Sequence, residues 1–219
     1  MSKNSNSKLA CVNIPSQFRT KHTSRKIDTI TIHTMAGNMS IESCGKLFQS
    51  KDKKASSNYG IGTDGRIALY VDEKDASWCS SNTANDERAI TIEVANDGGA
   101  KTGWHVSDEA MLALTSLLAD ICERNDIRRL LWKNDKSLIG NVKEQNLTVH
   151  RWFANKSCPG EYIMDKMDYI VNVVNHHLER IFPNKIYRVQ VGAYSKKENA
   201  VKMQEKLQKL GIESIIKES

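Results

Sequence analysis

Three segments of the sequence share one alternating pattern, which constrains the fold more than any other feature. Residues 28–34 (DTITIHT), 89–95 (AITIEVA) and 147–152 (LTVHRW) alternate aliphatic side chains with threonine and one ionisable residue. Successive side chains of a β-strand point to opposite faces, so each segment would have one apolar face and one polar face. The pattern therefore predicts three strands whose apolar faces pack on a core.

On the threonine face, the ionisable residues of these strands are His33, Glu93 and His150. If the three strands are neighbours in one sheet, these side chains converge on its polar face. A single histidine on a strand is more often a hydrogen-bonded structural residue. Two of them, with Cys158 eight residues after the second, indicate a site instead.

The rest of the main domain is predicted to contain one β-hairpin and three helices. An Asp-Gly turn within residues 57–71 predicts two antiparallel strands. Ser107 is a favourable N-cap for a helix over residues 108–123, where apolar residues recur at helical spacing. We also predict helices near residues 40–50 and over residues 160–182. Strands alternating with helices predict an α/β fold, with a mixed central sheet flanked by helices and a cleft on one face.

The expected domain boundaries follow from changes in pattern. Residues 1–182 form the main domain, of which residues 1–25 are a polar N-terminal arm. Pro183 cannot continue a helix, so residues 183–186 are expected to be a linker. Residues 187–219 then predict a small β-α-β unit with strands at 187–194 and 213–218 and a helix near 196–210.

Composition limits the environment and the partners. The chain has 39% hydrophobic residues, no apolar run of membrane-spanning length and an N-terminus without the apolar core of a secretory signal. We therefore expect synthesis in the cytoplasm without a signal peptide, and no transmembrane segment. Its five cysteines form no CxxC pair, which is typical of a reducing compartment. The net charge of +6 favours anionic polymers, but no motif indicates nucleic-acid binding.

Two imidazoles and one thiolate are ligands that Zn²⁺ accepts. His33, His150 and Cys158 therefore form a candidate site for one zinc ion per chain. Three protein ligands leave a fourth position open for water, which is the catalytic arrangement.

Four motifs in order resemble the amidase_2 family of N-acetylmuramoyl-L-alanine amidases, the superfamily of phage lysozyme-type amidases and peptidoglycan-recognition proteins. They are ITIHTMAG, SSNYGIGTDGRIALYV, AITIEVAN and VHRWFANKSCPG, within about residues 25–182. The resemblance implies zinc ligation by His33, His150 and Cys158. It also implies that Glu93 is the catalytic base and that Lys156 assists the oxyanion.

Two positions depart from that family. Ser57 stands where phage lysozyme-type members have a catalytic tyrosine, so the base is assigned to Glu93. Trp78-Cys79 replaces a Trp-His pair of many members, which leaves the substrate contacts near residue 79 and the role of Cys79 open. Two interpretations also stay open for Trp78 and Trp152: packing, or lining a cleft for sugar and peptide.

Residues 187–211 are similar to the first half of a sporulation-related (SPOR) repeat, which binds glycan strands stripped of stem peptides. A full domain needs two such β-α units, and the sequence holds one. Three alternatives follow: a segment cut short, a half domain that self-associates with a second copy, or a vestige. A single unit of this size would be marginally stable alone.

The expected function is zinc-dependent hydrolysis of the amide bond between N-acetylmuramic acid and L-alanine in peptidoglycan. We expect a bacteriolytic, antimicrobial endolysin of phage or prophage origin, which reaches the wall after release. A host sporulation or autolytic amidase is an alternative. A non-catalytic peptidoglycan-recognition module is another, but Cys158 and Lys156 stand against it.

Overall fold

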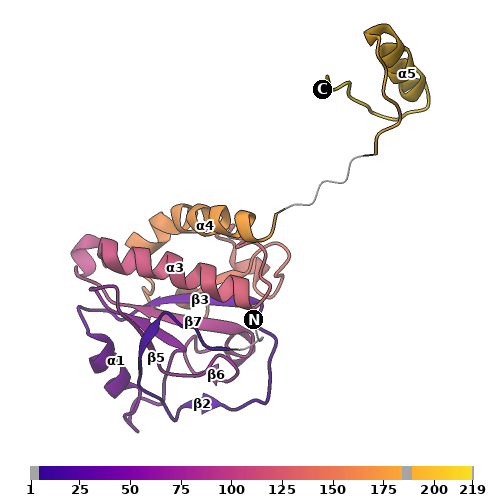
Figure 1. Cartoon of the computed structure of the whole chain (residues 1–219). Helices are drawn as coiled ribbons and strands as arrows, with labels where there is room; N and C mark the ends of the chain where they lie inside the picture. The colour runs from indigo at the N-terminus through magenta and orange to yellow at the C-terminus, as the bar shows by residue number, and fades with distance from the viewer. Residues whose placement is uncertain (1–4, 184–188, 219) are drawn as a thin grey trace. The chain divides into compact units, whose positions relative to one another are not determined.

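The computed structural model describes residues 5–183 and 189–218 of the chain (Figure 1). The chain divides into two compact units, Met1–Pro183 and Asn184–Ser219, and each is described by itself. No helix in the described ranges has both the length and the apolar character needed to cross a membrane.

A six-stranded mixed sheet forms the centre of the first unit, with the strand order β1-β5-β4-β7-β3-β8. The pairs β7–β3, β3–β8, β4–β7 and β1–β5 are parallel, and β4–β5 is the predicted antiparallel hairpin. A separate two-stranded antiparallel sheet pairs β2 with β6. The strand bounds are β1 Ala10–Asn13, β2 Arg19–Thr20, β3 Thr29–Thr34, β4 Tyr59–Ile61, β5 Ile67–Leu69, β6 Ala76–Ser77, β7 Ala89–Val94 and β8 Leu147–Val149.

Helices cover both faces of the central sheet, as the α/β prediction requires. The longest two, α3 and α4, lie together over one face, and α1 lies on the other side (Figure 1). The Ser107 side chain accepts a hydrogen bond from the Ala110 amide, which confirms the predicted cap of α3. The helix bounds are α1 Ile41–Leu47, α2 Thr83–Asp86, α3 Asp108–Arg124 and α4 Glu161–Ile181, with 3-10 turns η1 Ala100–Thr102, η2 Lys136–Leu138 and η3 His150–Trp152.

The two faces of strands β7, β3 and β8 differ in the way that the alternation predicts. The aliphatic face is fully buried in the main core with α3 and α4, and it consists of Ile30, Ile32, Ile90, Ile92, Leu147 and Val149. The threonine face is also buried, but it is hydrogen-bonded. Thr31 Oγ1 lies 2.8 Å from Thr148 Oγ1 and accepts a hydrogen bond from Asn85 at the end of α2. Satisfied polar contacts make this face rigid.

The predicted polar arm is wrong as a description of residues 10–20. Strand β1 extends the central sheet by pairing with β5, and β2 pairs with β6. Only alternate side chains of β1 are partly covered. A four-residue edge strand of this kind carries too few apolar residues to show a period in the sequence.

The third strand is shorter than predicted. It ends at Val149, and His150 begins the turn η3. The Arg151 amide donates a hydrogen bond to the Cys158 carbonyl, so the chain folds back on itself immediately after the strand. That turn brings the segment carrying Cys158 next to His150.

The second unit contains the predicted helix as α5 Lys197–Lys209. The predicted strands are not formed where the structure describes them: residues 189–194 and 213–218 have no strand, and residues 187 and 188 lie outside the described ranges. No side chain of α5 is buried. The two strands predicted for this unit would form a single strand pair, and isolated strand pairs are marginal in water.

A buried ion pair ties the loop between β5 and β6 to α3. The Arg124 guanidinium donates to both carboxylate oxygens of Glu73 at 2.6 and 2.8 Å, and the Tyr59 hydroxyl donates to the same carboxylate at 2.7 Å. The Glu73 side chain is fully buried and that of Arg124 is 3% exposed. Removing one partner would therefore leave an uncompensated charge in the interior.

We predict that Glu73→Ala lowers the free energy of unfolding by about 3–5 kcal/mol, the loss expected when half of a buried pair is removed. Urea denaturation followed by circular dichroism measures it. The control is Glu42→Ala, which removes an exposed carboxylate paired with Arg66 and should leave stability nearly unchanged. Equal stability of both variants would show that the Glu73 pair does not hold the fold.

Candidate metal centre

Strand register aligns the three ionisable residues of the sequence pattern. Within the parallel β3–β7 pair, His33 lies directly opposite Glu93. Within β3–β8, Ile32 lies opposite Val149, and His150 is the next residue after it. His33, Glu93 and His150 therefore meet at the carboxyl ends of three adjacent parallel strands.

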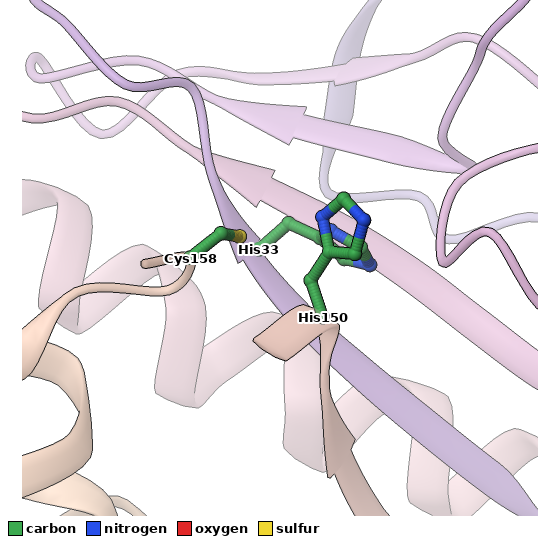
Figure 2. Close-up of side chains that lie close together, drawn as sticks. All are labelled: His33, His150 and Cys158. Carbon is green, nitrogen blue, oxygen red and sulfur yellow. The ribbon is translucent and has the colours of Figure 1, made fainter. Parts of the chain in front are cut away.

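Figure 2 shows the His33, His150 and Cys158 side chains close together, carried by a strand, a turn and a loop. The two imidazole rings have centroids 4.8 Å apart and are tilted by 53°. The nearest ligand atoms of the three residues all lie within 4.8 Å of one another. The structure thus brings together the three residues that the sequence assigned to zinc.

His33 is a fully buried histidine whose ring nitrogens make no hydrogen bond among the described residues. Burial, and then the nearby His150, hold the pKa of His33 well below its usual value. His33 is therefore neutral, which is the form that binds metals. Buried polar atoms rarely stay unpaired, so the orphaned nitrogens fit a bound cation.

Cys158 completes the donor set. Its sulfur accepts a hydrogen bond from the Thr34 amide at 3.3 Å, next to His33 in the chain. Burial, and then the Glu93 carboxylate, raise the pKa of the thiol to about 12. Coordination to a cation deprotonates such a thiol, because the ion's charge dominates the local electrostatics. Two imidazoles and one thiol fit zinc in this setting.

Glu93 lies at the edge of this group. Its Oε1 atom is 4.0 Å from His33 Nδ1, and the Cys79 sulfur lies 3.9 Å from the same oxygen. Burial raises the pKa of Glu93 to about 8, an effect that the Cys79 hydrogen bond partly opposes. The other oxygen, Oε2, is buried without a partner among the described residues.

Lys156 is exposed in the loop between η3 and α4. Its charge is close enough to lower the pKa of His150, although burial is the larger cause of that shift. Lys156 therefore lies within electrostatic range of the cluster.

The two flanking tryptophans differ. Trp152 is 8% exposed, and its ring stacks on Trp132 at 5.1 Å, which favours packing over a cleft role. Trp78 is 43% exposed, donates from Nε1 to Thr20 Oγ1 at 3.1 Å and lies beside the Phe18 ring.

Two contacts of the site have no clear signal in the sequence. His33, Cys79 and Glu93 also have ligand atoms within 4.8 Å of one another. Ser81 Oγ lies 3.5 Å from His150 Nε2. Both Cys79 and Ser81 belong to an irregular segment between β6 and α2, where no period marks which side chains face the site. Burial, and then Glu93, keep the pKa of the Cys79 thiol well above its usual value.

The solved structures most useful for comparison include PlyL, an AmpD derivative and a mutant endolysin from Bacillus subtilis. PlyL is 13% identical, with 69% of this chain and 85% of that chain covered and a TM-score of 0.51. The AmpD derivative is 18% identical, with 78% of this chain and 99% of that chain covered and a TM-score of 0.52. The endolysin is 16% identical, with 74% of this chain and 97% of that chain covered and a TM-score of 0.50. At these identities the similarity shows a shared fold.

Comparison with the curated proteins gives no match. The model of the SPOR domain matches residues 183–219. The model of the Amidase_2 family, described as N-acetylmuramoyl-L-alanine amidase, matches residues 23–161, which include strands β3, β4, β5, β7 and β8 of the central sheet, both histidines and Cys158. The chain therefore belongs to the N-acetylmuramoyl-L-alanine amidase family, whose activity is directed at peptidoglycan.

Proposed function

We propose that this protein is a zinc-dependent hydrolase of the amide bond between N-acetylmuramic acid and L-alanine. The observation that carries the proposal is the convergence of His33, His150 and Cys158, with both nitrogens of the buried His33 unpaired among the described residues. These three side chains would hold the ion. When bound, zinc supplies Lewis acidity, which polarises a carbonyl and makes water more acidic.

Glu93 is the proposed general base. Its carboxylate accepts a proton from the attacking water as the new carbon–oxygen bond forms. It then gives that proton to the alanine nitrogen as the carbon–nitrogen bond breaks, so the carboxylate ends unchanged. Its position beside His33, with one buried oxygen unpaired among the described residues, supports this role.

Lys156 is proposed to stabilise the negative charge that develops during the reaction. Negative charge develops on the carbonyl oxygen when water attacks the amide, and a nearby ammonium group stabilises that charge. The influence of Lys156 on the pKa of His150 supports its proximity to the reacting region.

We further propose an endolysin-type, bacteriolytic role at the cell wall. A SPOR-like segment follows the amidase domain, and an enzyme that strips glycan strands benefits from remaining bound to its product. The fold is shared with a Bacillus subtilis endolysin, which is compatible with this role. Trp78, which is exposed and precedes Cys79 in the chain, is a candidate for contact with the substrate.

Zinc ligation gives the first prediction about the function. The purified protein should contain about one zinc ion per chain, as a three-ligand catalytic site requires. Cys158→Ser should lose most of the metal and the activity. The matched control is Cys11→Ser, which changes an exposed cysteine on β1 and should keep both. Elemental analysis after dialysis measures the ratio; full zinc in Cys158→Ser would refute the ligand assignment.

Catalysis gives the second prediction. Glu93→Gln should keep its zinc but lose about 10²- to 10⁴-fold in kcat, the usual contribution of a general base. Digestion of purified cell wall should release new alanine amino groups without new reducing sugars. Glu144→Gln, an exposed residue paired with Lys133, is the control and should turn over normally. Normal turnover in Glu93→Gln would exclude Glu93 as the base.

Wall binding gives the third prediction. The whole chain should sediment with peptidoglycan stripped of stem peptides more than residues 1–182 alone, because the SPOR-like segment would add contacts to glycan. The two forms should cleave a soluble muramyl peptide at the same rate. Equal sedimentation of both forms would show that residues 187–219 do not contribute to wall binding.

A further inference from the structure

We propose that Cys79 is a positioning residue that holds the Glu93 carboxylate by an S–H···O hydrogen bond. The proposal rests on the function proposed for Glu93. The Cys79 sulfur lies 3.9 Å from Glu93 Oε1, on the irregular segment between β6 and α2.

Glu93 depends on few neighbours. Within the described part of the chain, the Cys79 thiol gives the one hydrogen bond that this carboxylate receives, and Oε2 receives none. His33 Nδ1 is 4.0 Å from Oε1, but it belongs to a proposed metal ligand. A largely buried carboxylate with one donor is held in place chiefly by that donor.

The main chain at Cys79 is itself anchored. The buried Asp86 carboxylate accepts hydrogen bonds from the Cys79 amide at 3.1 Å and from the Ser80 amide at 3.1 and 3.3 Å. The Asp86 carbonyl in turn accepts a hydrogen bond from Arg25. These bonds fix where the Cys79 thiol can point, as supporting residues do around preorganised catalytic groups.

The segment that carries Cys79 also contacts His150, through Ser81. Ser81 has a left-handed backbone conformation, with φ of 63°, and its hydroxyl lies 3.5 Å from His150 Nε2. Such a conformation is uncommon for a residue with a side chain. One anchored segment, residues 79–81, therefore contacts both the proposed base and a proposed ligand. These two contacts favour a positioning role for Cys79 over a role in packing alone.

The test compares Cys79→Ala and Cys79→Ser. We expect Cys79→Ala to lower kcat about tenfold, in the range seen when supporting hydrogen bonds are removed. KM, zinc content and thermal stability should stay unchanged. Cys79→Ser should recover most of the lost rate, because a hydroxyl can also donate to the carboxylate. The control, Cys122→Ala, removes a fully buried thiol from α3 and should leave kcat unchanged.

A double-mutant cycle separates positioning from a merely structural role. In the Glu93→Gln background, Cys79→Ala should cause no further loss of the residual rate, since the group that Cys79 positions is already disabled. An unchanged kcat in Cys79→Ala, no recovery in Cys79→Ser, loss of zinc, or an equal further loss in the double variant would each overturn the proposal.

The outcomes also distinguish the two proposals. Normal turnover of Glu93→Gln would refute the proposed base, whatever Cys79 does. A severe loss in Glu93→Gln together with full turnover of Cys79→Ala would refute the positioning role alone.

Discussion

The parallel register of β7, β3 and β8 determines both the core and the candidate site of this protein. The same pairing that buries the aliphatic face of these strands against α3 and α4 sets His33 opposite Glu93 and brings His150 alongside. A slip of one residue in β3 would move its isoleucines out of the core and turn His33 away from its partners. The free energy of hydrophobic burial therefore also fixes the geometry of the polar groups.

Buried ionisable side chains are hydrogen-bonded differently in the scaffold and in the candidate site. Glu73 is fully paired by Arg124 and Tyr59, so the low dielectric around it strengthens bonds that are already satisfied. His33 is equally buried, yet its nitrogens have no partner among the described residues, and Glu93 has a pKa raised to about 8 by burial. Buried groups with strongly perturbed pKa values and unpaired atoms, in surroundings that are otherwise hydrogen-bonded, are typical of a functional site.

The sequence predicted those strands in which apolar and polar residues alternate regularly. Alternation identified β3, β7 and β8, although β8 ends earlier than predicted, and the same period placed His33 and Glu93 on one face. The Ser107 cap identified the start of α3. Edge strand β1 was missed because only alternate residues are partly covered, and the turn at His150 was missed because backbone hydrogen bonds to the Cys158 segment create it. The contacts of Cys79 depend on Asp86, so no local pattern could reveal them.

Anomalous diffraction from crystals at the zinc absorption edge tests the central claim most directly. We predict one strong peak per chain among His33, His150 and Cys158, about 2.0–2.1 Å from each bonded nitrogen and about 2.3 Å from the sulfur. A peak held by other residues, or none in a fully active preparation, would contradict a zinc centre built on these three parallel strands.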